Sequence, residues 1–337
     1  MKKRFSKKNS FLKKKFIQLC RLLGFEIIDQ ASYEVVTSEK KINEKLSELG
    51  ERSITIPTGQ LKIKRAVKNL HVIMRTCMLD SMLTQKKKRL FEKKKIEYVL
   101  RSLQSLLNAI NYFKKNNKNF DIKISILDTR SKIEQVNKLK NFIKKTKMNI
   151  EIKTTNLDEF KNKISGVKSI AMFSFMSNLY NSFNMAKKSE YDLTYFIDDD
   201  YIHHPKCIEE LIYTYEKFAT LTNKEIILCP SDYPYLYFKP ENTYILLGEN
   251  YHWRRVNESL CVFMTSKKMI KKKWNDLIKL ANCLNDPFEK PLHKIYKKEI
   301  CFSPIPSISM HYANINSIYG LSPNVDWIAI WKKSEYR

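Results

Sequence analysis

The chain has 337 residues, of which 43% are hydrophobic and 12% aromatic, so it can bury the core of one large or two modest domains and is not a disordered chain. Its 62 Lys and Arg against 35 Asp and Glu give a formal net charge of +27, which favours anionic partners such as nucleotides, anionic lipid and nucleic acid. A dedicated nucleic-acid role is disfavoured, because only 11 of these cations are Arg, the side chain best suited to reading bases and phosphates.

The 7 cysteines are scattered and form no CxxC pair. An odd number without short spacings argues against a disulfide framework or a zinc knuckle, and it favours a reducing compartment. The sequence shows no apolar run of membrane-spanning length and no secretory signal pattern. These features predict a cytoplasmic protein.

Residues 1–66 are interpreted as a basic N-terminal extension that is partly helical. Residues 1–25 contain nine Lys or Arg and no Asp or Glu, while Phe11, Phe16 and Leu23 belong to an apolar set at roughly helical spacing. One interpretation is a basic amphipathic helix that makes the protein peripheral to the anionic inner face of the membrane. The other is a solvated helix that docks on the domain through its apolar stripe.

Alternation of strands and helices begins near residue 70 and predicts an α/β fold with a mostly parallel sheet between helices. The basic run 86–95 is interpreted as a loop or a helix start. The apolar spacing predicts strands at 70–74, 120–127, 148–153, 193–197, 225–229, 244–247, 259–265 and 300–308, and helices at 96–113, 133–144, 177–187, 205–221 and 268–284, with a further helix opened by Asp286 and Pro287.

Three carboxylates, Asp198, Asp199 and Asp200, directly follow the apolar strand 193–197. Adjacent carboxylates repel one another unless a cation neutralises them, and oxygen ligands at a strand end suit Mg²⁺ or Mn²⁺. The run therefore predicts a metal–diphosphate site, which Asp128 at the end of another strand would share. The alternative is that the acidic turn only caps the helix that begins near Pro205.

The order of these motifs resembles the GT-A fold of nucleotide-sugar glycosyltransferases, and within it the family 2 type of bacteria and phages. The resemblance covers about residues 68–315, so we assign 67–315 to a GT-A domain and 316–337 to a C-terminal tail. It is carried by strand 70–74 with Arg75-Thr-Cys77, Asp128-Thr-Arg-Ser131, Asn178 and Asn181, Phe196-Ile-Asp-Asp-Asp200, Asn285-Asp286-Pro287 and His311.

The resemblance implies that Asp198 and Asp200 are the two acidic residues of a DxD motif. Asp200 would hold a divalent metal, Mn²⁺ or Mg²⁺, that bridges the donor diphosphate. Asp198 would contact the ribose or the metal, Asp199 would fill the middle position, and His311 would complete the metal shell. The alternative for His311 is a structural role.

The resemblance also implies a nucleotide-sugar pocket and a catalytic base. Asp128 would bind the base of the nucleotide, Arg75 and Thr76 would pack on the nucleotide, and Asn178 and Asn181 would contact the donor. Asp286 matches the base position of inverting enzymes, with Asp232 and Glu249 as weaker candidates. Arg254 or Arg255 would bind the diphosphate, and Trp253 would stack on a sugar. The alternatives are a helix cap for Asp286, a turn for Asp128 and a packed loop around Trp253.

The sequence thus predicts a metal-dependent, inverting glycosyltransferase that moves a sugar from a nucleotide-diphosphate sugar to a glycan, lipid-linked or protein acceptor. No Gln-x-x-Arg-Trp signature is present, which argues against a processive polysaccharide synthase. Two alternatives stay open. One is a metal-dependent nucleotidyltransferase or nuclease that uses the same carboxylates on phosphate esters. The other is a non-catalytic basic protein that binds nucleic acid or membrane.

Overall fold

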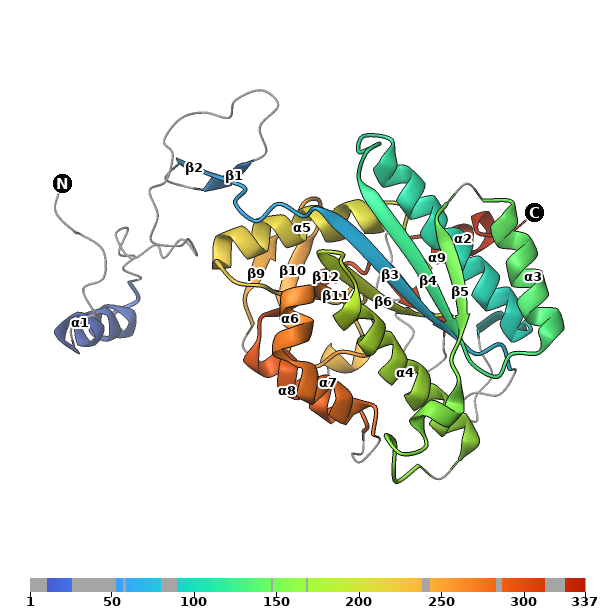
Figure 1. Cartoon of the computed structure of the whole chain (residues 1–337). Coiled ribbons are helices and arrows are strands. Elements are labelled where there is room, and N and C mark those ends of the chain that lie inside the picture. The colour runs from blue at the N-terminus through green and yellow to red at the C-terminus, as the bar shows by residue number, and fades with distance from the viewer. Residues whose placement is uncertain are drawn as a thin grey trace.

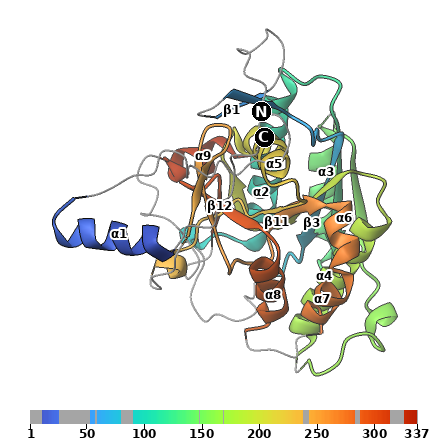
Figure 2. The same cartoon turned by 90° about the vertical axis from the view of Figure 1, so that its left-hand side faces the viewer.

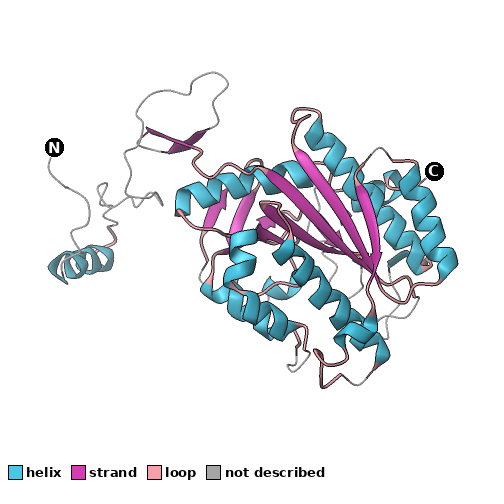
Figure 3. Ribbon diagram, in the orientation of Figure 1, coloured by secondary structure: helices cyan, strands magenta, loops and turns pink. Residues whose placement is uncertain are grey.

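The computed structural model describes residues 11–25, 53–56, 59–79, 90–146, 148–167, 169–237, 243–282, 287–312 and 325–336. A central sheet lies between two layers of helices (Figure 1, Figure 3). Its nine strands run in the order β5 (Ile150–Thr154), β4 (Asp121–Asp128), β3 (Asn69–Thr76), β6 (Leu193–Asp198), β11 (Phe263–Ser266), β8 (Ile227–Leu228), β12 (Cys301–Ile305), β10 (His252–Arg255) and β9 (Ile245–Leu247).

The sheet has a parallel block and a mixed block. Strands β5, β4, β3 and β6 are all parallel, and they carry the longest ladders of the molecule. Strand β11 then runs antiparallel to both β6 and β8, β12 is parallel to β8, and β10 and β9 complete the sheet as antiparallel strands. The predicted α/β architecture is confirmed, and its parallel character comes from the first block.

Both faces of the sheet are covered, because its central strands are apolar on both sides. On one face, the side chains of Val72, Tyr195 and Ile197 pack against α2 (Lys95–Lys114), α3 (Ile133–Lys144) and α5 (Cys207–Thr222). On the other, Ile73 and Phe196 pack against α4 (Ile170–Lys188), α6 (Lys267–Lys272), α7 (Trp274–Leu280) and α8 (Lys290–Lys298). Helices α7 and α8 lie side by side in both views (Figure 1, Figure 2).

The order of the first four strands creates a switch point between β3 and β6. The chain runs from β3 through α2 to β4 and through α3 to β5, with both helices on one face. It then returns through α4 on the opposite face and adds β6 to the other side of β3. In open α/β sheets, the carboxyl ends of the strands at such a point border the ligand-binding crevice.

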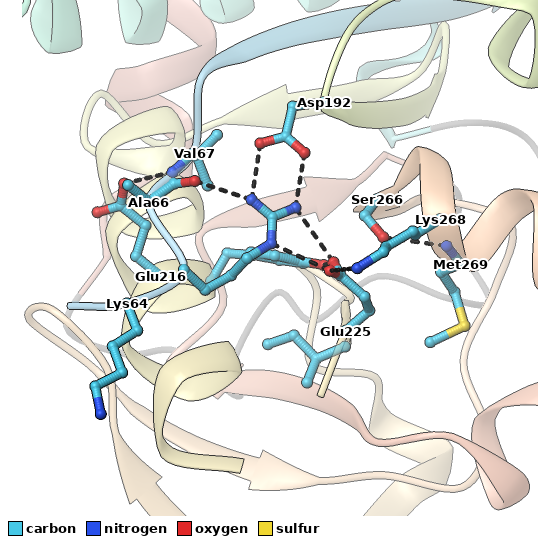
Figure 4. Close-up of polar contacts among 12 residues, drawn as sticks. Lys64, Ala66, Val67, Asp192, Glu216, Glu225, Ser266, Lys268 and Met269 are labelled. Carbon is cyan, nitrogen blue, oxygen red and sulfur yellow. Dashed lines mark hydrogen bonds and ion pairs between the residues drawn. The ribbon is translucent and has the colours of Figure 1, made fainter. Parts of the chain in front are cut away.

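Arg65 helps to fix the residues just before β3 to the domain. The guanidinium of Arg65 lies 2.7 Å from Asp192 and 3.2 Å from Glu225, and its backbone N–H donates to Thr220. Asp192 and Glu225, together with Val67 and Glu216, are seen in Figure 4. Burial would lower the pKa of Arg65, but its bonds to the two carboxylates outweigh that effect and raise it. The hairpin of β1 (Ser53–Ile56) and β2 (Gly59–Lys62) precedes this point.

The last part of the described chain packs on α2. Helix α9 (Trp327–Lys333) lies in the segment that the sequence assigned to a tail, and Trp331 stacks against Tyr312 and lies 4.7 Å from the guanidinium of Arg101. A separate antiparallel ladder joins β7 (Tyr201–His203) to β13 (Ser309–His311). The predicted strand 300–308 is therefore shorter in the structure, since β12 ends at Ile305 and β13, which follows at Ser309, belongs to a different sheet.

Helix limits differ from prediction where local capping decides them. Helix α3 covers the predicted range 133–144, but α4 begins at Ile170, because the Ser169 side chain accepts from the backbone N–H of Met172. The predicted helix 268–284 is divided at Lys273 into α6 and α7. Helix α1 (Phe11–Leu22) is confirmed as a helix.

Candidate functional site

The carboxyl ends of β3, β4 and β6 bring the predicted donor residues to one edge of the sheet. In the parallel ladders, Arg75 on β3 is the register partner of Asp198 on β6, and Thr76 is the partner of Asp128 on β4. These are the strands on either side of the switch point. The predicted convergence of Asp128 and the aspartate run on one crevice edge is therefore seen in the strand register.

Arg75 and Asp198 form an ion pair across the switch point. The Nε atom of Arg75 donates to Asp198 Oδ1 at 2.8 Å, and Nη2 donates to the carbonyl of Cys261 at 3.0 Å. The third nitrogen, Nη1, is buried and finds no hydrogen-bond partner among the described residues. Burial would lower the pKa of Arg75, but the Asp198 charge and hydrogen bond outweigh it and raise that pKa, so the guanidinium stays charged.

Asp199 and Asp200 share a second cation, the ammonium of Lys95. The Nζ atom lies 2.5 Å from Asp199 Oδ1 and 3.2 Å from Asp200 Oδ2, and the Lys95 side chain is only 6% exposed. The other Asp199 oxygen accepts from the backbone N–H of Cys77 at 3.0 Å. Burial raises the pKa of Asp199 to about 6, although Lys95 opposes this shift.

His311 adjoins the same carboxylates through the β7–β13 ladder. Its register partner is Tyr201, on which its ring stacks with centroids 4.6 Å apart. Its Nε2 atom lies 3.3 Å from Asp200 Oδ1, and the backbone N–H of Tyr312 donates to the Asp200 carbonyl at 2.9 Å. The structure thus places His311 beside Asp200, with its ring stacked on Tyr201.

The predicted metal ligands are not gathered into one ligand set in this structure. Asp198 is engaged by Arg75, whereas Asp200 faces Lys95 and His311. Over the described ranges, no three His, Cys, Asp or Glu side chains are grouped as they would be around a metal ion. The side-chain arrangement therefore does not fit a divalent ion, because an ammonium lies where the carboxylates would coordinate it. Metal binding remains a prediction.

Asp128 is oriented by two hydroxyl groups. Thr76 Oγ1 and Ser131 Oγ donate to Asp128 Oδ1 at 2.8 Å and 2.6 Å. The turn that returns Ser131 to Asp128 places Arg130 at φ +55°, in the left-handed region that non-glycine residues seldom adopt. Asp128 is 2% exposed, and burial raises its pKa against the opposing effect of Ser131 and Thr76. A carboxyl group held in this way can accept a hydrogen bond from a nucleobase N–H.

Asn178 and Asn181 are engaged within the protein. The Asn178 amide donates to the carbonyls of Leu127 at 2.8 Å and Thr76 at 3.3 Å, so it links the ends of β3 and β4. Asn181 donates to Thr155 Oγ1 at 3.0 Å. In this structure, Asn178 holds the carboxyl ends of β3 and β4 together. A direct contact of Asn178 or Asn181 with the sugar donor stays a prediction.

A second polar cluster follows β8, which runs parallel to β6 in the overall sheet and ends at the same edge. Asp232 binds Arg254 at 2.5 Å and accepts from the hydroxyl of Tyr237, on whose ring the guanidinium lies at 4.4 Å from the centroid. Burial raises the pKa of Asp232, opposed by Tyr237 and Arg254. Arg254 is thus held by a carboxylate and an aromatic ring, and Tyr237, which is 51% exposed, forms the outer surface of this cluster.

Trp253 is fully buried and does not present a face to solvent in this structure. Its indole Nε1 donates to Glu210 Oε1 at 2.9 Å, and its ring packs edge-on against Phe218. Gly248 adjoins the indole so closely that an added Cβ would lie 2.5 Å from Nε1. Trp253 is therefore packed inside the fold, on strand β10 and not in a loop, and its buried ring does not fit the predicted stacking on a sugar.

The predicted base Asp286 lies outside the described residues. Its weaker alternative Glu249 pairs with Lys217 at 2.8 Å. Sequence reasoning missed Lys95, which it placed in a charged loop or helix start. The one signal for Lys95 was its position at the end of the basic run 86–95, directly before the apolar periodicity of α2 begins.

No protein-family model matches the chain, and no curated protein matches it. Among solved structures, it is similar to TarS 1–349 of S. aureus in complex with UDP, with 14% identity and a TM-score of 0.43 over 70% of this chain and 57% of that one. It is also similar to the inositol-1-phosphate CTP transferase of T. maritima, with 13% identity and a TM-score of 0.40 over 80% and 98% of the two chains. The galactosyltransferase LgtC, in complex with donor and acceptor sugar analogues, matches with 9% identity and a TM-score of 0.38 over 78% and 94%.

The chain thus spans little more than half of the TarS structure that it matches. Separately, each helix in the described part of the chain is too short or too polar to cross a membrane.

Proposed function

We propose that this protein is a glycosyltransferase that moves a sugar from a nucleoside-diphosphate sugar to a glycan, lipid-linked or protein acceptor. The observation that carries the proposal is the ion pair of Arg75 and Asp198 at the switch point, beside the oriented carboxyl group of Asp128. Parallel α/β sheets bind ligands in the crevice at such a point. A nucleoside diphosphate needs both a hydrogen-bonding group for its base and fixed cations for its phosphates.

The proposed roles follow from the positions of the side chains. Asp128 accepts a hydrogen bond from the nucleobase, while Thr76 and Ser131 keep its carboxyl group oriented. Arg75 offers its remaining nitrogen, Nη1, to an anionic oxygen. Charge that develops on the departing diphosphate is stabilised most effectively by cations that need no rearrangement during the reaction.

On the acceptor side, we propose that Asp286 removes the proton from the attacking hydroxyl, as the resemblance implies. Attack from the face opposite the diphosphate inverts the anomeric carbon. The cluster of Asp232, Arg254 and Tyr237 lies along the same edge, and its exposed tyrosine ring offers a surface for an acceptor sugar. Asp232 itself is already paired with Arg254, so it is less suited to act as the base.

Donor hydrolysis is the direct test, because it needs no knowledge of the acceptor. The purified chain is incubated with a panel of nucleotide-sugars, with Mn²⁺ and separately with EDTA, and released nucleoside diphosphate is measured. We expect release from one donor, and its loss in Asp128→Ala and Arg75→Met. Release of pyrophosphate from a nucleoside triphosphate, or cleavage of an oligonucleotide, without any hydrolysis of a nucleotide-sugar would show instead that the protein is a nucleotidyltransferase or a nuclease.

We also propose that α1 attaches the protein to an anionic membrane surface. Its large apolar side chains Phe11, Leu12, Phe16, Leu19 and Leu22 are 54–85% exposed, and nine Lys or Arg lie within residues 1–25. Exposed apolar side chains on a basic helix insert at the interface, while the cations bind acidic headgroups. This position suits a transferase with a lipid-linked acceptor.

A further inference from the structure

We propose that Lys95 is the resident cation of the aspartate run, so that the aspartates hold two built-in cations, Lys95 and Arg75, against the donor diphosphate and no divalent metal is required. This inference rests on the proposed function and specifies how that site neutralises phosphate charge. It reverses the role of the aspartates: they position cations of the chain instead of binding a metal ion.

The first support is the geometry around Lys95. Its ammonium bridges two carboxylates, at 2.5 Å from Asp199 and 3.2 Å from Asp200. A metal ion bound by the same two oxygens would lie about 2.1 Å from each of them. Such an ion and the ammonium would compete for the same space, so binding of the metal requires Lys95 to leave.

The second support is that the surroundings fix Lys95 in place. It is the first residue of α2, where the positive end of the helix dipole disfavours a cation, and yet it is 5% exposed. The backbone N–H of Cys77 occupies Asp199 Oδ2 and leaves Oδ1 to the lysine. Helix α2 itself is held from behind by α9, through Arg101 and Trp331. A buried ammonium at a helix N-terminus is stable only when carboxylates neutralise it, and Asp199 and Asp200 do this for Lys95.

The third support is the separate pairing of Asp198. One oxygen of this carboxylate, Oδ1, already accepts from Arg75 Nε at 2.8 Å, so Asp198 has a cation of the chain as its partner, separate from the Lys95 that Asp200 faces. Arg75 is 3% exposed, and its Nη1 has no hydrogen-bond partner among the described residues. Buried donors are nearly always satisfied, so this nitrogen is suited to an anionic oxygen of a ligand.

The sequence directly before Lys95 is strongly basic. Lys95 ends the run 86–95, which contains seven Lys or Arg and one Glu. Within this run, Lys93 and Lys94 are exposed and directly precede Lys95. Exposed cations of this kind attract anionic ligands without a metal ion.

The test measures binding rather than turnover. Uptake of Mn²⁺ is followed by the loss of the free-ion electron paramagnetic resonance signal, and binding of UDP, GDP and CDP is followed by calorimetry with EDTA or with Mn²⁺. The variant Lys95→Met removes the charge at nearly constant length. The matched control is Lys93→Met, an exposed lysine two residues earlier in the same run.

We expect the wild-type chain to take up no Mn²⁺ below about 1 mM and to bind its nucleoside diphosphate equally well, within about twofold, in EDTA and in Mn²⁺. Lys95→Met should lose at least about tenfold in diphosphate affinity in EDTA and gain Mn²⁺ binding at the vacated carboxylates. Lys93→Met should behave as the wild type in both assays.

Stoichiometric Mn²⁺ uptake by the wild type, or a loss of diphosphate affinity in EDTA, would overturn the inference. These wild-type measurements decide the matter even if Lys95→Met fails to fold. If no nucleoside diphosphate binds in any buffer, the proposed function fails. The Mn²⁺ measurements still separate the two ideas, because exclusion of Mn²⁺ by wild type and its uptake by Lys95→Met would support Lys95 as the resident cation.

Discussion

Replacing Glu210 with Gln is expected to destabilise the fold by about 3 kcal/mol, because this fully buried carboxylate receives several hydrogen bonds and the amide cannot keep them all. Its Oε1 atom accepts from Trp253 Nε1 at 2.9 Å and from the Glu249 backbone at 3.0 Å. Its Oε2 atom accepts from the backbone and side chain of Asn250 at 2.7 Å and 3.1 Å. One carboxylate on α5 thereby positions the loop that leads into β10.

The magnitude follows from the geometry. Glutamine has one acceptor oxygen, so its NH₂ group must face two of the former donors whichever way the amide is turned. Each buried donor left without an acceptor costs about 1–3 kcal/mol, which gives roughly 2–6 kcal/mol for two. The amide is easier to bury than a carboxylate, and this offsets part of the loss. A net loss of about 3 kcal/mol corresponds to a fall in Tm of about 6–12 °C for a domain of this size.

The assay is thermal unfolding of the Glu210→Gln variant, followed by circular dichroism, with limited proteolysis to locate the change. Glu159→Gln, at an exposed position, serves as the control and should stay within about 0.5 kcal/mol of wild type. We expect new cleavage in the segment 243–255 of the Glu210→Gln variant before global unfolding. A fall in Tm of less than about 2 °C would show that the carboxylate does not hold this loop.

Three further predictions concern stability and attachment. Burial lowers the pKa of His203 from 6.5 to about 3, so the imidazole stays neutral in the folded state, while the unfolded chain takes up a proton below pH 6.5. The free energy of unfolding is therefore unaffected by this group above pH 6.5 and falls by about 2 kcal/mol by pH 5. Urea titrations at pH 7.5 and pH 5 should therefore show that the free energy of unfolding falls less between these two pH values in His203→Gln than in the wild type. An equal fall in both proteins would contradict this assignment. Arg65→Met should lower the free energy of unfolding by about 2 kcal/mol, which is less than for a fully buried pair because the Arg65 side chain is 24% exposed. An unchanged urea midpoint would show that the bonds of Arg65 to Asp192 and Glu225 do not stabilise the fold. Phe16→Asp with Leu19→Asp should abolish sedimentation with vesicles that contain phosphatidylglycerol, whereas equal binding by the variant would disprove the attachment through α1.

The parallel half of the fold could be predicted from the sequence because its signals are local. Strands at 120–127 and 193–197 are apolar runs that end in polar residues, and the helix at 133–144 has regular apolar spacing, so their limits agree with the structure to within a residue or two. The register of Asp128 with Thr76, and of Asp198 with Arg75, then follows from parallel strands that end at one edge.

The mixed block of the sheet and the β7–β13 ladder were harder to predict from the sequence, because the partners of their strands are distant in the chain. The short strand β7 pairs with β13 more than 100 positions later, and no local pattern announces either partner. Strand β10 was interpreted as loop because its residues are polar and aromatic, and its place depends on the ladder to β12. The partners of the aspartates were missed for the same reason: Lys95 belongs to a basic run whose composition is that of a solvated segment, and only tertiary packing buries it.

The ladder between β7 and β13 has a consequence for the order of synthesis. Asp200 is translated about a hundred residues before Tyr312, whose backbone N–H binds its carbonyl, and before His311, which lies against its carboxylate. A nascent chain that has released β6 from the ribosome therefore carries the aspartates without these partners. The contacts of Asp200 with His311 and Tyr312 can therefore form only after β13 has been synthesised, so this group of side chains is incomplete while β6 alone has emerged.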